Sequence, residues 1–233
     1  MPGTTITPPT AGEPAAARPG AAADSEIARE VAELNLSGLS LLQRTLRELK
    51  AMPACQPQPL PPALRATGTR WLDLGHDALA RLAVQPFVLF DGGFDRSGRW
   101  SEAEGVRDTQ ASASVTPGGE AAAAYARTVF AYAWYLARSS PTQASLVFGM
   151  AGATAAAIGS RSLSQVERLA RAHPDWLSLR WDDDPQIWAR LIDLAVSPDP
   201  RSIRELQRRA LQRFAGTRWI AADGALHGVP ASR

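Results

Sequence analysis

The chain has very little cysteine or histidine. Its 233 residues include a single cysteine, Cys55, and three scattered histidines, His76, His173 and His227. One thiol cannot close a disulfide within the chain, and no cysteine or histidine pair has the spacing of a zinc site. Cys55 lies in a proline-rich stretch without a nearby histidine, so it does not indicate a nucleophile. We therefore expect a cytoplasmic protein without a cofactor or a structural metal.

Long apolar runs and common catalytic motifs are also missing. No stretch has 18 consecutive apolar residues, and the N-terminus lacks a basic start followed by an apolar core, so we expect neither a membrane span nor a secretory signal. There is no glycine-rich phosphate loop and no Gly-x-Ser-x-Gly sequence. Asp182–Asp184 could suggest a metal site, but three adjacent carboxylates cannot all point inward. Asp184 before Pro185 is better explained as a helix N-cap. The sequence indicates a non-enzymatic protein.

Lysine is nearly absent. Lys50 is the only lysine, whereas the chain has 24 arginines. Together with abundant Ala, Gly and Pro, this arginine bias is typical of GC-rich coding, so it indicates no function by itself. The distribution of charge is more informative. Residues 201–218 hold six Arg and one Glu, a local charge of +5, whereas the whole chain carries +2 and the remainder therefore −3. A basic segment on a mildly acidic body is typical of an arm that faces a polyanion.

Apolar periodicity predicts an all-α protein, mainly helical with short extended segments. We expect disordered tails at 1–24 and 220–233, and a proline-rich loop at 53–66. Extended segments are expected at 87–90 and 176–181, and Gly92–Gly93 is expected to form a turn. Asn35 lies on or beside the apolar side of the first helix. We interpret it as an edge residue that reaches solvent, the alternative being a buried polar residue that fixes a helix contact. The expected helices are 27–50, 69–84, 120–137, 142–149, 151–159, a serine-capped helix ending at 173, 185–194 and 201–215.

The chain also contains an internal repeat. A shift of 87 positions places Arg81–Ala83 on Arg168–Ala170 and Phe94–Asp95 on Trp181–Asp182, and one inserted residue later Trp100 meets Trp188. This period is too long for a solenoid unit and indicates a duplicated small domain. We therefore divide the chain into a first repeat at 25–104, a flexible linker at 105–119, a second repeat at 120–200, and a basic C-terminal helix at 201–219.

Two blocks of sequence resemble FlhD, a subunit of the flagellar master transcriptional activator. The first block is Leu34–Ser37 with Leu39, Leu41 and Gln43–Arg44, at the spacing of the first FlhD helix. The second resembles a later part of FlhD and comprises Ala144, Phe148–Met150, Ala155–Ala156, Ser162–Gln165, Arg168–Ala170 and Leu179–Asp183. The resemblance implies a tandem FlhD-like chain that forms a monomeric pseudo-dimer and acts with an FlhC-like partner on promoter DNA. The proline-rich stretch at 53–68 departs from the pattern, because the second repeat has a helix there.

Two segments are candidates for contact with DNA. In the helix expected at 201–215, apolar residues form one face and five arginines fan around the other: Arg201, Arg204, Arg208, Arg209 and Arg213. These arginines could contact phosphates; the alternatives are an acidic protein partner or an ordinary solvated face. Residues 155–171 resemble a helix-turn-helix that would present Arg161, Ser164, Gln165 and Arg168, and they equally fit a plain helical hairpin.

The sequence thus predicts a non-enzymatic transcriptional regulator or regulator subunit, which acts through protein contacts and through DNA contact by the basic helix. The alternative is a protein-interaction adaptor or secretion accessory module that does not bind DNA.

Overall fold

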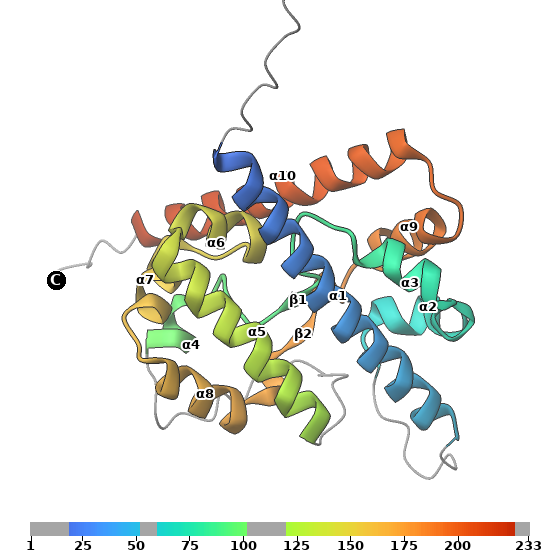
Figure 1. The fold of residues 1–233 in the computed structure, drawn as a ribbon, viewed down its shortest axis with the longest axis horizontal. Helices are drawn as coiled ribbons and strands as arrows, with labels where there is room; N and C mark the ends of the chain where they lie inside the picture. The colour runs from blue at the N-terminus through green and yellow to red at the C-terminus, as the bar shows by residue number, and fades with distance from the viewer. Residues whose placement is uncertain (1–18, 52–59, 102–119, 227–233) are drawn as a thin grey trace, which may run out of the picture.

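The computed structural model describes residues 19–51, 60–101 and 120–226, and within these ranges the chain is predominantly α-helical (Figure 1). The predicted all-α class is confirmed. The expected linker at 105–119 and the outer parts of both expected tails lie outside the described residues. The extended elements of the described residues are two short strands, β1 (Phe90–Asp91) and β2 (Ser178–Leu179), and a 3-10 helix spans Pro174–Trp176. The helices are α1 (Pro19–Ala51), α2 (Pro62–Asp73), α3 (His76–Ala83), α4 (Ser97–Ser101), α5 (Glu120–Ser139), α6 (Pro141–Phe148), α7 (Gly152–Gly159), α8 (Leu163–Ala172), α9 (Pro185–Val196) and α10 (Pro200–Leu226).

Several helix starts follow directly from their capping residues. The Ser140 side chain accepts a hydrogen bond from a backbone N–H of α6, whose first residue is a proline. Ser162 and Gln165 form a reciprocal capping box at the start of α8. Asp184 caps α9 as predicted. These side chains accept from backbone N–H groups that have no partner within the helix, which explains why each helix begins where it does.

Several helix boundaries differ from those predicted, most of all in three places. α1 begins at Pro19 instead of residue 27, because the run of alanines after Gly20 favours helix and proline is tolerated in the first turn. The helix expected at 69–84 is two helices, and the first of them starts at Pro62, inside the expected loop. Gly75, with extended backbone angles, separates α2 from α3. α10 continues through Gly216, where we expected it to end, since an internal glycine costs only about 1 kcal/mol.

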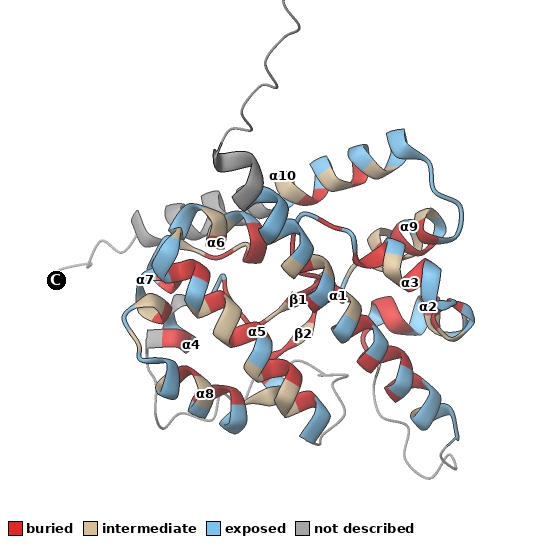
Figure 2. Cartoon of the chain, viewed as in Figure 1, coloured by how far each residue is buried: buried red, intermediate tan, exposed pale blue. Residues whose placement is uncertain are grey.

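The described residues share one hydrophobic core in which aromatic side chains are prominent. Trp100 is fully buried and lies 5.1 Å from Phe130 and 5.4 Å from Trp176, measured between ring centroids. A second aromatic contact joins Trp71 and Trp188 at 5.3 Å. α5 has eight buried residues, among them Phe130, while Tyr135 on its other side is exposed. Figure 2 shows this buried interior between the helices.

Two buried polar side chains connect distant parts of the chain. Asn35 is 0% exposed; it donates to Ala83 O at 3.1 Å and Phe87 O at 2.9 Å, and it accepts from Leu89 N at 2.7 Å. The interpretation of Asn35 as a solvent-exposed edge residue is therefore wrong, and the alternative of a polar residue that fixes a contact describes it better. The reason is that α3 and the segment after it cover this part of α1. The buried Arg180 guanidinium has the same effect, because it donates to three carbonyl oxygens, those of Val88, Phe90 and Phe148.

The helices form two groups on either side of the short β1–β2 pair (Figure 1). α1 lies with α2, α3 and α9, whereas α5 lies with α4, α6, α7 and α8. α9 comes from the second half of the sequence and packs on α2, while α4 comes from the first half and packs on α7. The two halves therefore exchange a helix, and neither half encloses its core alone.

A pair of backbone hydrogen bonds recurs at positions 88 residues apart. Ala63 N donates to Asp182 O at 2.9 Å, and Ala151 N donates to Phe94 O at 3.2 Å. The two donors, Ala63 and Ala151, are 88 positions apart in the sequence, and so are the two acceptors, Phe94 and Asp182. Each bond joins the start of one helix to a turn in the other half of the chain.

The strand pair and its following turns show the same spacing. β1 and β2 are antiparallel, with Phe90 opposite Leu179 and Asp91 opposite Ser178. Ser178 lies 88 residues after Phe90, and Leu179 lies 88 residues after Asp91. A shift of 88 therefore maps each pair onto the other. Gly93 and Trp181, also 88 residues apart, both have a left-handed backbone, with φ of 68° and 54°. In this region the backbone conformation of the first half is repeated 88 residues later. The identical residues of the sequence repeat align best at a shift of 87, one residue less.

Candidate nucleic-acid interface

The start of α10 is fixed by Asp199. Its carboxylate accepts from Arg201 N at 3.2 Å and from Ser202 N at 3.0 Å, and Pro200 occupies the first turn, where its missing N–H is not needed. Hydrogen bonds from the Ser202 hydroxyl and from these backbone N–H groups lower the pKa of Asp199. The capping carboxylate therefore stays ionised at neutral pH and sets where the arginine-rich helix begins.

One side of α10 anchors it to the body. Leu206 and Ala210 are buried, Ile203 and Leu211 are half-buried, and α10 contacts α9. Gln207 extends this side by placing its Nε2 3.4 Å from Gln85 Oε1. The predicted division of this helix into an apolar face and a basic face agrees with these burials (Figure 2).

Three arginines of α10 lie on its exposed side. Arg201, Arg204 and Arg208 are spaced three and four residues apart, so they share one stripe of the helix. All three are exposed, and none forms an ion pair with a carboxylate of the residues that the structure describes. We call these three residues the arginine stripe. Its side chains are exposed to solvent, and Arg204 lies near enough to the capping carboxylate of Asp199 to help lower the pKa of that group.

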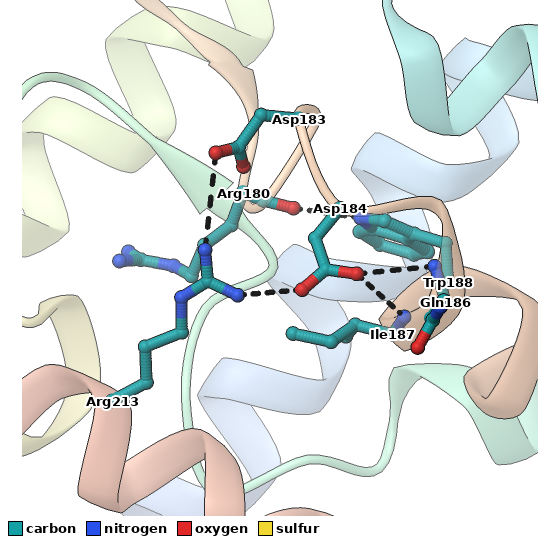
Figure 3. A network of polar contacts seen from close by, with 7 residues as sticks. All are labelled: Arg180, Asp183, Asp184, Gln186, Ile187, Trp188 and Arg213. Atoms are coloured by element: carbon teal, nitrogen blue, oxygen red, sulfur yellow. Dashed lines mark hydrogen bonds and ion pairs between the residues drawn. The ribbon is translucent and has the colours of Figure 1, made fainter.

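The other two predicted arginines are paired. Arg209 forms an ion pair with Glu205 one turn earlier in the same helix. Arg213 reaches across to the start of α9, where its Nη1 lies 2.7 Å from Asp184 Oδ2 and its Nη2 lies 3.8 Å from Asp183 Oδ2 (Figure 3). The structure thus separates the five arginines into an exposed stripe and two members held by carboxylates.

Asp184 serves two structural purposes at once. One carboxylate oxygen accepts from Gln186 N at 3.1 Å and Ile187 N at 3.3 Å, and the other accepts from Arg213 (Figure 3). Partial desolvation favours the neutral acid, but the hydrogen bond from Arg213 and those from the two backbone N–H groups outweigh it, so the pKa of Asp184 is lowered. The sequence predicted the cap. It gave no signal for the ion pair, whose partner lies 29 residues away.

The neighbouring groove between α9 and α10 has a volume of about 410 Å³ and is open to solvent. Charges of both signs line it, including Arg190, Asp193 and Glu205. Asp193 is paired with Arg70 of α2, and Glu205 with Arg209. This mixed charge does not favour an anionic ligand over a cationic one.

The second predicted site, the helix-turn-helix of α7 and α8, uses two of its candidate side chains within the fold. Arg161 is half-buried and donates through Nη2 to Trp100 O at 2.6 Å. Gln165 accepts from Ser162 N at 2.8 Å as part of the capping box. Arg168, by contrast, is exposed, as is Ser164. The contacts of Arg161 and Gln165 favour a structural helical hairpin over a surface that reads DNA.

No group of three or more His, Cys, Asp or Glu residues in the described part of the chain is arranged to hold a metal ion. The helices described include none with the length and apolar character needed to cross a membrane. No protein-family model matches the chain, and comparisons with curated proteins and with solved structures find no significant match.

Proposed function

We propose that this chain is a DNA-binding regulator subunit that contacts duplex phosphates through α10. The observation that carries the proposal is the arginine stripe, whose three exposed guanidinium groups lie on a helix anchored by its opposite side. Arginine suits this contact because its planar fork can donate two hydrogen bonds to one phosphate and keeps its charge at any physiological pH.

The dimensions of the stripe fit several phosphates. From Arg201 to Arg208 the helix rises about 10 Å, and successive phosphates of one DNA strand are about 3.4 Å apart along the duplex axis. Contacts of this kind position a protein on DNA but carry no sequence information. A regulator built in this way therefore needs a second subunit to read bases. The FlhC-like partner implied by the resemblance to FlhD would fill that role at a promoter.

We also propose that the chain arose by tandem duplication and folds as a pseudo-dimer. The recurring backbone bonds and left-handed turns 88 residues apart support this, as does the exchange of α4 and α9 between the two groups of helices. Such an exchange is typical of two subunits that swap an element. One chain would then supply what two subunits supply in an FlhD homodimer.

The DNA contact is tested by fluorescence anisotropy with a labelled duplex across a salt series. Three phosphate contacts predict a slope of about −2.7 in log K against log salt, and hence about 40-fold weaker binding at 200 mM than at 50 mM salt. The triple variant R201A/R204A/R208A should lose this slope and most of its affinity at low salt. The variant R44A/R47A/R65A removes the same charge from exposed arginines of α1 and α2 and should bind as the wild type does.

Two outcomes would contradict the DNA contact. One is a stripe variant that binds as tightly as the wild type. The other is equal loss of binding in the two triple variants, which would indicate an effect of total charge without a localised interface.

The second candidate is an adaptor that does not bind DNA, and two exposed valines favour it. Val84 and Val196 are 64% and 62% exposed. They lie at the adjoining ends of α3 and α9, which the bond from Arg81 Nε to Ala195 O joins at 2.7 Å. Affinity capture from the native organism distinguishes the candidates, because a partner that is retained after nuclease treatment, without enriched DNA, supports the adaptor.

A further inference from the structure

One face of α9 and one face of α10 form the walls of the groove between these two helices. The lining residues recur at intervals of three and four positions, which places them on a single face of each helix. They include Arg190, Asp193 and Leu194 on α9 and Glu205, Leu206 and Arg209 on α10. The volume of about 410 Å³ lies in the lower part of the range of about 300–1,000 Å³ that is usual for small-molecule sites. The groove therefore has room for a small ligand.

Arg190 and Glu205 lie on opposite walls of this groove at nearly the same height. The two helices are consecutive, and Arg213 of α10 reaches back to Asp184 at the start of α9, so they run antiparallel. Arg190 is six residues before the end of α9, and Glu205 is five residues after the start of α10. These positions are roughly 9 Å and 7.5 Å from the end at which the helices are connected. The fold thus places a cation and an anion across from each other.

Both charged groups can accept a further partner. Arg190 is exposed, and no carboxylate of the residues that the structure describes forms an ion pair with it. Arg209 contacts Glu205 through Oε1, and a carboxylate has a second oxygen that can accept from a ligand. Leu194 is half-buried and Leu206 is buried, so the same groove also offers apolar surface. These are the parts of a site for a molecule with two opposite charges and an apolar group.

We propose that the groove between α9 and α10 binds a free amino acid with an apolar side chain. The carboxylate of the ligand would accept two hydrogen bonds from the planar guanidinium of Arg190, and its ammonium group would donate to Glu205. Its side chain would pack on Leu194 and Leu206. A ligand with a single charge would meet a group of like charge on one wall, whereas a zwitterion has a partner on both. The arginine stripe does not line the groove, so this inference does not depend on the proposed DNA contact.

Calorimetric titration of the full chain tests the site with L-leucine and two analogues that each lack one charge. N-acetyl-L-leucine has no ammonium group and L-leucinamide has no carboxylate. Each analogue should bind about threefold to fivefold more weakly than L-leucine, the effect expected from losing one solvent-exposed charge contact. Arg190→Met keeps the length of the aliphatic stem; it should weaken L-leucine by a similar factor and leave L-leucinamide unchanged. Glu205→Gln should weaken L-leucine but not N-acetyl-L-leucine.

The matched control is Arg171→Met, which removes the same charge from an exposed arginine of α8 and should bind L-leucine as the wild type does. The inference is overturned if L-leucine, L-valine and L-phenylalanine all fail to give saturable binding at millimolar concentrations. Equal affinity for L-leucine and both analogues, or unchanged L-leucine binding by Arg190→Met, would overturn it as well. The stripe variant R201A/R204A/R208A should retain L-leucine binding, so failure of the DNA contact and failure of this site are distinguished.

Discussion

Replacing Asn35 with alanine should destabilise the fold more than any substitution at a solvent-facing position of α1. The side chain is fully buried and makes three hydrogen bonds that tie α1 to the end of α3 and to the segment that leads into β1. Each such bond contributes about 1 kcal/mol net, and a buried group left without a partner costs a further part of its desolvation. We expect the free energy of unfolding to fall by about 3 kcal/mol, which corresponds to about 6–12 °C in Tm for a chain of this length.

The measurement is equilibrium unfolding in urea, followed by the fluorescence of the tryptophans. The control is Ser37→Ala, two residues further along α1 at an exposed position, which should change stability by less than about 0.5 kcal/mol. Asn35→Asp should be worse than Asn35→Ala, since a carboxylate would face two carbonyl oxygens in a buried site. If Asn35→Ala unfolds within about 0.5 kcal/mol of the control, the three bonds do not hold these segments together.

Two further predictions concern packing and assembly. Gly38→Ala should destabilise the protein by about 1–3 kcal/mol, because the added methyl group would overlap the Tyr125 hydroxyl and the Phe90 ring where α1 meets α5. Gly68→Ala is the control: it lies in open space on α2 and should stabilise the protein slightly. Equal urea midpoints for the two variants would refute this prediction. If the chain is a pseudo-dimer, light scattering after size exclusion should give the mass of one chain, 24.9 kDa, and a stable homodimer would count against it.

The parts of the fold that the sequence predicted are those set by local chemistry. Asp184 caps α9 as predicted because its side chain reaches N–H groups two and three residues away, and that distance is fixed by helix geometry. The two faces of α10 followed from residue spacing alone. The boundaries that were mispredicted lie where weak preferences compete, as at Gly216.

The features that the sequence did not predict are contacts between residues that are far apart in the chain. Nothing near Asn35 indicates that the end of α3 covers it, and nothing near Arg180 indicates that three carbonyl oxygens converge on its guanidinium. The candidate site shows the same limit. Residue spacing placed all five arginines of α10 on its polar side, but only the packing of α10 beside the start of α9 distinguishes the exposed Arg208 from the paired Arg213.

The proposed interface is asymmetric, because the arginine-rich helix α10 occurs once in the part of the chain that the structure describes. Shifted back by 88 positions, residues 208–226 fall on 120–138 in α5, which opens the second repeat, so no helix among the described residues of the first half corresponds to the arginine helix. A symmetric dimer would present two such helices related by its axis, and would match a palindromic site. This chain presents one stripe on one side of a body whose backbone repeats. If α10 contacts duplex DNA as we propose, this single stripe would fix how the chain is oriented on the duplex, and under the same proposal the reading of bases would fall to a partner subunit.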